Sequence, residues 1–185
     1  IHQIDLLAYL LGDWDGVRAD LWRLARDTGT EDASTATVTF ASGAVATVVT
    51  SAVSPREVSA IRIDTERATV TVEHLYGHGH DHWRITPAPH VDAAEAAGWE
   101  LPDVEEASGH TPLVREVYAA LATGHELPAV AAEPARSFEI VSAVYSSAAH
   151  DGARVTPEAL RADAARMRSL EAPVGERRPA PHRAS

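Results

Sequence analysis

The stretch from residue 34 to residue 53, STATVTFASGAVATVVTSAV, constrains the fold more than any other part of the sequence. Its first half alternates between an apolar side and a threonine side. The apolar side is Ala36, Val38 and Phe40, and the threonine side is Thr35, Thr37 and Thr39. Ser42-Gly43 supplies a tight turn before the alternation resumes, which predicts an antiparallel β-hairpin. The second strand has small or β-branched residues on both faces, which favours helices over one face and another subunit over the other.

Further strands are expected at residues 17–26, 59–64 and 68–75, with a weaker one at 82–86. The residues from Pro87 to Gly109 show no steady period and are expected to form a long excursion.

The first eleven residues form the clearest helical pattern. Ile1, Ile4, Leu7, Leu10 and Leu11 recur at helical spacing, and Gly12 follows as a stop signal. No capping residue precedes Ile1, so we expect that the sequence begins inside a helix of a longer protein.

Three more helices are expected towards the end of the chain. Thr111 caps the first, which has an apolar stripe and ends at Gly124. The second starts near Pro134 and ends at Asp151-Gly152, and Thr156-Pro157 opens the third. The stripes are Leu113, Val117, Ala120 and Leu121, then Phe138, Val141, Val144, Tyr145 and Ala148, then Leu160, Ala164 and Met167.

This order of elements predicts an α+β fold, with an open, mostly antiparallel sheet and helices packed on one face. Residues 1–170 are expected to form one domain. The last residues, 171–185, are Pro-rich, contain clustered arginines and lack apolar periodicity, so they are expected to be a disordered tail.

The composition excludes several classes of function. A formal net charge of −11 disfavours nucleic acid and anionic membranes as partners, because the basic residues are scattered. No apolar run is long enough to span a membrane. The absence of cysteine excludes disulfides and fits a reducing cytoplasm.

His2, Asp5 and Tyr9 share one side of the first helix, away from its apolar stripe. A histidine on such a side can accept the proton that an alcohol loses when it is oxidised. The alternative is an ordinary solvent-facing side with a His-Asp hydrogen bond.

The sequence resembles the C-terminal domain of the Gfo/Idh/MocA oxidoreductases, from His2 to about Val155. The resemblance rests on HQIDLLAYLLGD, the acidic pair Glu31-Asp32, FASGAVATV and SFEIVSAVYSSAAHDGARV. It implies an NAD(P)-dependent enzyme acting on a sugar, inositol or related polyol, and a homo-oligomer formed through the open face of the sheet. The family's catalytic pattern places the histidine at His2 and a later acid at Asp5. Its earlier Asp would precede residue 1.

The resemblance also implies that NAD or NADP is bound mainly by an N-terminal Rossmann domain, which supplies the catalytic lysine and is absent from this sequence. No residue here is predicted to bind the cofactor. Gly77-His78-Gly79 is the only G-x-G, and a strand-like segment follows it instead of a helix. The chain alone is therefore expected to be inactive. The alternative is a stand-alone, non-catalytic binding or assembly module, which a start codon close to Ile1 would support.

The histidine-rich segment HLYGHGHDHW contains donor types suited to zinc or nickel: His74, His78, His80, His82 and Asp81. Short His-rich tracts are unspecific, so the sequence predicts no metal site and a mobile loop between strands. A zinc-binding protein is the third reading.

Three other residues have a structural and a functional reading. Trp14 could stack on a sugar, but it is expected to pack in the protein. His110 is expected to fix the turn before Thr111, and Tyr145 is expected to lie in the core with its hydroxyl bonded to a polar partner.

Overall fold

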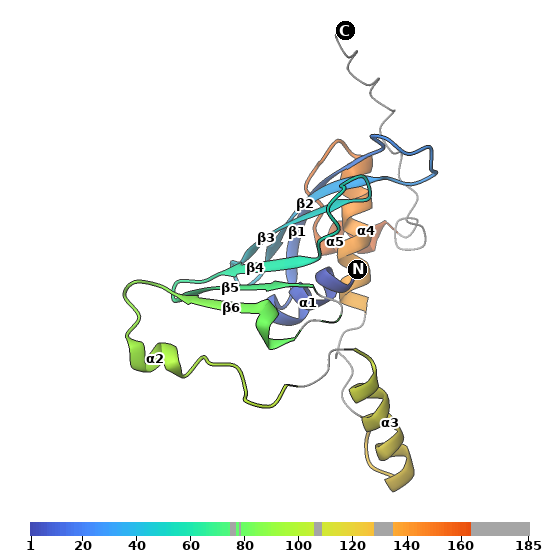
Figure 1. Cartoon of the computed structure of the whole chain (residues 1–185). Helices are drawn as coiled ribbons and strands as arrows, with labels where there is room; N and C mark the ends of the chain where they lie inside the picture. Colours follow the sequence, from blue (N-terminus) through green and yellow to red (C-terminus); the bar gives the residue numbers. More distant parts are fainter. Residues whose placement is uncertain (75–76, 78, 106–108, 128–134, 164–185) are drawn as a thin grey trace. The chain divides into compact units, whose positions relative to one another are not determined.

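The computed structural model describes residues 1–74, 77, 79–105, 109–127 and 135–163 (Figure 1). The chain divides into two compact units. The first unit comprises Ile1–Pro55 and Val130–Ser185, and the second unit comprises Arg56–Ala129. The predicted tail at 171–185, and the predicted core positions Ala164 and Met167, lie outside the described residues.

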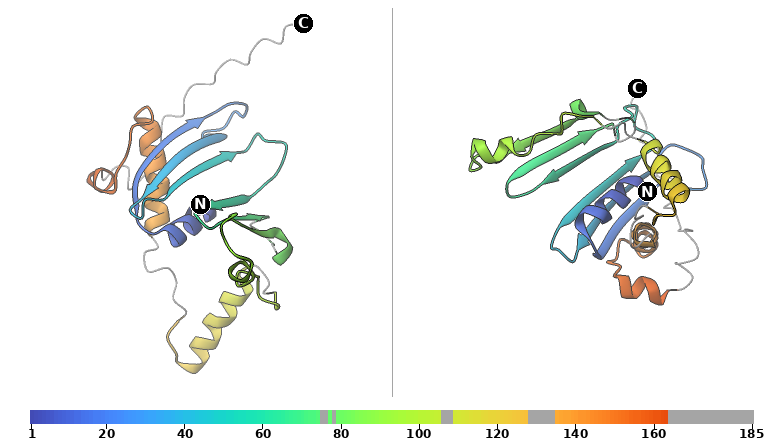
Figure 2. Two further views of the ribbon diagram at one scale, coloured as in Figure 1. Left: turned by 90° about the vertical axis from the view of Figure 1, so that its left-hand side faces the viewer. Right: turned by 90° about the horizontal axis from the view of Figure 1, so that it is seen from below.

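In its described residues, the first unit contains one antiparallel sheet and three helices. The sheet has the order β1-β2-β3, formed by β1 (Trp14–Trp22), β2 (Ala33–Phe40) and β3 (Val45–Ser51). The helices are α1 (His2–Leu11), α4 (Ala135–Ala149) and α5 (Pro157–Ala162). Buried residues of all three helices join one hydrophobic cluster with the inward side chains of the sheet. The α+β fold with helices on one face of an open sheet is therefore confirmed (Figure 2).

The predicted hairpin at 34–53 is present as the antiparallel pair of β2 and β3. Ala36, Val38 and Phe40 of β2 are buried, and Thr37 is exposed. On β3, however, the described chain covers only the face that carries Ala46, because Val45 and Val49 are 65% and 69% exposed. The open face lacks the cover that the composition of this strand predicted.

β1 starts at Trp14, three residues before the predicted start, and ends at Trp22 instead of residue 26. The ladder ends there because the backbone N–H groups of residues 24, 25 and 26 bind the carboxylate of Asp32 instead of a strand. The free edge of β1 is also covered. Val17 pairs with Val155, and the N–H of Ala19 donates to Ser147 Oγ at 2.9 Å.

α4 packs on β1 with a face that only partly matches the predicted one: Val144 is buried and Tyr145 and Ala148 pack against the core cluster, as predicted. Phe138 is 39% exposed, whereas Ile140, Ala143 and Ser147 are essentially inaccessible. The small side chains of Ala143 and Ser147 let the helix backbone approach β1 closely, and Ser147 bridges Ala19 N and Ala153 O. The prediction that Phe138 and Val141 lie on the core side was therefore wrong for Phe138, and Val141 is only partly buried.

The ends of α1 and α5 agree largely with the sequence signals. Gly12 follows the last residue of α1, as predicted. At the other end, Ile1 occupies the N-cap position and is 61% exposed, so it does not join the apolar stripe. Thr156 caps α5 by accepting from Ala159 N, and Leu160 is buried as predicted.

The second unit contains a separate antiparallel sheet of order β4-β5-β6. Its elements are β4 (Ala60–Asp64), β5 (Ala68–Glu73), the one-turn helix η1 (His80–His82), β6 (Trp83–Pro87), α2 (Ala93–Ala97) and α3 (Thr111–Thr123). The excursion from 87 to 109 contains α2, which was not predicted and which Asp92 caps through Glu95 N. Gly124 ends α3 in the left-handed conformation, as predicted. His110, not Thr111, holds the N-cap position, and its side chain makes no capping bond.

Candidate active site

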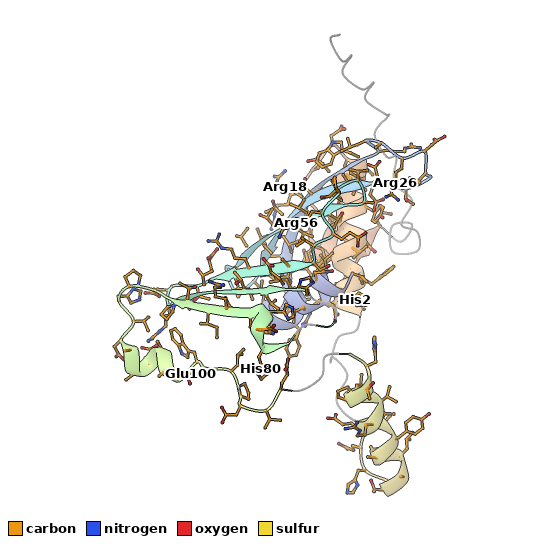
Figure 3. The ribbon with its side chains drawn as sticks, in the orientation of Figure 1. His2, Arg18, Arg26, Arg56, His80 and Glu100 are labelled. Carbon is orange, nitrogen blue, oxygen red and sulfur yellow. The ribbon has the colours of Figure 1, made fainter. Side chains whose placement is uncertain are left out.

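His2 is the first residue of α1 and is exposed (Figure 3). Ile4, Leu7, Ala8 and Leu11 of the same helix pack on the core. Tyr9 is 77% exposed, so the polar side of the helix lies away from the core, as its spacing predicts. Asp5 lies one helical turn after His2, and it is exposed overall.

One carboxylate oxygen of Asp5 is held by α4. Ser137 Oγ donates to Asp5 Oδ1 at 2.7 Å, and the serine itself is 8% exposed. Arg136, the preceding residue, forms an ion pair of 2.8 Å with Asp13, just beyond the other end of α1. The first turn of α4 therefore fixes α1 near both of its ends. Nothing in the sequence pattern singled out Ser137, because its partner is 132 residues away.

Trp14 is a packing residue and does not present its ring for stacking on a sugar. It is 4% exposed, and its indole Nε1 donates to Glu139 Oε2 at 3.3 Å. Arg161 of α5 binds the same carboxylate through Nε at 2.8 Å and Nη2 at 3.0 Å. Hydrogen bonding from Arg161, assisted by Trp14, lowers the pKa of Glu139 below its ordinary value. This cluster ties α4 to α5 and to β1.

The acidic pair Glu31-Asp32 has two different structural roles. Asp32 is 3% exposed, and its carboxylate accepts from the N–H groups of Leu24, Ala25 and Arg26 at 2.7–2.8 Å. These backbone bonds, led by that of Leu24, lower the pKa of Asp32 from 3.8 to about 2. Asp32 therefore organises the loop after β1.

Glu31 accepts a hydrogen bond of 2.8 Å from the hydroxyl of Tyr145. Burial, followed by this contact with Glu31, raises the pKa of Tyr145 from 10.0 to about 12. Tyr145 packs against the core cluster, so the prediction of a core tyrosine with a polar partner is confirmed.

The histidine-rich segment connects β5 and β6. His74 and His82 lie with ring centroids 5.0 Å apart in an edge-to-face arrangement. Within the described residues there is no group of three or more donors that could hold a metal ion, and His78 lies outside them. The described geometry gives no support to the zinc-binding reading.

The described residues do not fit a dinucleotide site. All strand ladders in the described ranges are antiparallel, whereas a dinucleotide site needs parallel strands joined by a helix that meets the pyrophosphate. Gly77 and Gly79 precede only the three-residue η1. No helix of the described part is long and apolar enough to cross a membrane.

Residues 1–73 match the family model of the GFO/IDH/MocA C-terminal domain. The resemblance to the Gfo/Idh/MocA C-terminal domain is confirmed. No curated protein sequence matches the chain.

Solved structures extend this likeness beyond residue 73. The Bordetella pertussis WlbA dehydrogenase, solved with NADH and UDP-GlcNAcA, is 24% identical and matches 84% of this chain and 44% of its own, with a TM-score of 0.64. The Chromobacterium violaceum WlbA dehydrogenase, with the same ligands, is 27% identical over 84% of this chain and 43% of its own, with a TM-score of 0.59. The aldose-aldose oxidoreductase of Caulobacter crescentus, complexed with glycerol, is 18% identical over 84% of this chain and 45% of its own, with a TM-score of 0.60. The chain thus spans under half the length of these oxidoreductases.

Proposed function

We propose that this chain is the substrate-binding and oligomerising part of an NAD(P)-dependent oxidoreductase that acts on a CH–OH group of a sugar, inositol or related polyol. The observation that carries the proposal is the arrangement at the start of α1. An exposed histidine stands one turn before an acid whose carboxylate is fixed by Ser137. WlbA with UDP-GlcNAcA and levoglucosan dehydrogenase with L-sorbose support the sugar class.

In this proposal His2 accepts or relays the proton of the substrate hydroxyl. The imidazole suits this task because histidine exchanges protons near neutral pH. Asp5 orients the ring or stabilises its charged form, and Ser137 is a positioning residue that limits the rotation of the Asp5 side chain. The accompanying hydride acceptor, NAD or NADP, is assigned to a dinucleotide-binding domain outside this sequence, because the described residues do not fit that cofactor.

The open face of the β1–β3 sheet is proposed as the interface between copies of the chain. Its cross-strand rows are Gly16, Thr39 and Val45, then Arg18, Thr37 and Thr47, then Asp20, Thr35 and Val49. Exposed valines of β3 border this threonine-rich surface, and such small and β-branched side chains form flat faces suited to association. The absence of cysteine supports a reducing compartment, and we place the protein in the cytoplasm.

The experiment that tests the catalytic proposal begins with the intact mass of the product of the native locus, compared with this 185-residue chain. If the native product is larger by a dinucleotide-binding domain, that longer protein is the enzyme to assay. In it, His2→Gln is compared with the control His125→Gln, which changes a histidine at an exposed position of the second unit. Loss of the proton acceptor at His2 should lower kcat/KM about 10²–10⁴-fold, whereas His125→Gln should leave kcat/KM unchanged.

Two results would overturn the proposal. A native product of the same mass as this chain would favour the non-catalytic assembly module. A larger product in which His2→Gln retains full kcat/KM would keep the oxidoreductase but remove His2 from its chemistry.

A further inference from the structure

The one-turn helix η1 is closed by two reciprocal hydrogen bonds between Gly79 and His82. The N–H of His82 donates to the carbonyl oxygen of Gly79 at 3.1 Å. In the other direction, the N–H of Gly79 donates to Nδ1 of the His82 ring at 2.8 Å. The next residue, Trp83, begins β6 and pairs with Val72 of β5. The His82 ring therefore closes the turn from which β6 starts.

The same nitrogen has a second partner that requires the opposite protonation state. Asp81 Oδ1 lies 3.1 Å from His82 Nδ1. To accept from Gly79, Nδ1 must present its lone pair, so the ring must be neutral with its proton on Nε2. To donate to the Asp81 carboxylate, Nδ1 must carry a proton. A single nitrogen has one such position in the ring plane, so the two contacts exclude each other.

Charged and titratable groups surround this ring from three segments. Asp81 and His80 belong to η1 itself. Glu105, from the segment after α2, accepts from the backbone N–H of His80 at 2.9 Å, and its carboxylate lies against Gly79. His74, at the end of β5, contacts the His82 ring edge to face. The two carboxylates favour a charged His82, whereas a protonated His74 opposes it.

We propose that His82 is a proton-driven conformational switch of the second unit. In its neutral form, His82 accepts from Gly79 and holds η1 closed. When Nδ1 takes a proton from solvent, the ring donates to Asp81 and the N–H of Gly79 loses its acceptor. The turn that leads into β6 then loosens.

The test is a pH titration of the 185-residue chain by nitrogen-15 NMR, with two readouts. The ring nitrogen shifts of His82 report which nitrogen carries the proton, and amide exchange reports the hydrogen bond of Gly79. As Nδ1 becomes protonated, the protection of the Gly79 amide, corrected for intrinsic exchange, should fall about tenfold, the cost of one ordinary hydrogen bond.

His82→Gln is the matched control, because glutamine at the third position of a helix accepts from the N-cap N–H without titrating. Gly79 protection should then be independent of pH. Asp81→Asn removes the acceptor of the protonated state and should move the His82 midpoint to lower pH, whereas His74→Gln should move it to higher pH.

Three outcomes would overturn the switch. The first is a Gly79 amide whose protection is unchanged while His82 titrates. The second is a pH-dependent loss of protection that persists in His82→Gln. The third is an His82 midpoint that Asp81→Asn does not move. The first of these is read on the unmodified chain, so it does not depend on the folding of a variant.

Discussion

Ser137 Oγ donates a 2.7 Å hydrogen bond to Asp5 Oδ1, and this bond joins the helix of the proposed catalytic histidine to α4. Ser137 is buried, so a substitution that removes its hydroxyl leaves the carboxylate without this donor. Another serine of α4, Ser142, is 1% exposed, and its hydroxyl has no hydrogen-bond partner among the described residues. The two serines form a natural pair for comparison.

Ser137→Ala should reduce the free energy of unfolding by about 1–2 kcal/mol, because it removes a hydrogen bond to a charged group. Ser142→Ala should leave that free energy unchanged or raise it slightly, since it removes an unpaired buried hydroxyl. Urea unfolding at constant m-value checks both. Equal losses in the two variants would show that the Asp5 contact contributes nothing beyond helix packing.

Acid should destabilise the first unit through Asp32. The folded pKa of about 2 lies below the ordinary 3.8, so Asp32 contributes stability above pH 4 that is lost as the pH falls through that interval. Asp32→Asn should lower Tm at pH 7 and flatten its dependence on pH between 4 and 2.

Asp27→Asn, at an exposed position of the same loop, provides the same change in charge. Thermal unfolding of both variants from pH 7 to pH 2 checks the prediction. If Asp27→Asn flattens the profile as much as Asp32→Asn does, net charge and not the backbone contacts of Asp32 governs the effect.

Alkaline titration should reveal Tyr145 as a separate step. Its pKa of about 12 lies above the ordinary 10.0, so the stability it contributes is present below pH 10 and is lost as the pH rises through 12. Absorbance at the phenolate band should show a late step that Tyr145→Phe removes. Tyr118→Phe, at a 70% exposed position, is the control and should leave this late step in place. A late step that survives in Tyr145→Phe would contradict the Glu31 contact.

The proposed interface on the β1–β3 sheet predicts a change of assembly when charge is added there. The double variant Val45→Lys and Val49→Lys should shift the protein to a smaller oligomer, because desolvating two lysines opposes association. Val104→Lys changes a 77% exposed valine of the second unit and should leave the mass unchanged. Light scattering after size-exclusion chromatography measures both. A double variant with the parental mass would exclude this face as the interface.

Local patterns predicted much of the fold because they depend on neighbouring residues. The alternation at 34–53 predicted β2 and β3, and Thr156 and Gly124 marked helix ends that are present. The same reasoning failed for Phe138, because a helix with apolar residues on more than one side does not reveal which side meets the sheet. Close packing on β1 selected the side with Ala143 and Ser147.

The candidate site shows the same division. Spacing alone placed His2, Asp5 and Tyr9 on one side of α1, and the exposure of Tyr9 agrees with it. Spacing could not show that Ser137 binds Asp5, since that contact forms only when α4 folds back onto α1. The role of His2 in catalysis stays a prediction.

The sequence by itself determined most of the segments that form helices and strands, because periodicity and capping act within a few residues, although it did not reveal α2. Only the tertiary structure decided which partners two adjacent carboxylates bind. Glu31 and Asp32 are adjacent carboxylates, yet one receives the hydroxyl of Tyr145 and the other binds three backbone N–H groups. The partners of Glu31 and Asp5 are more than 100 residues distant, and only the packing of α4 brings them into contact.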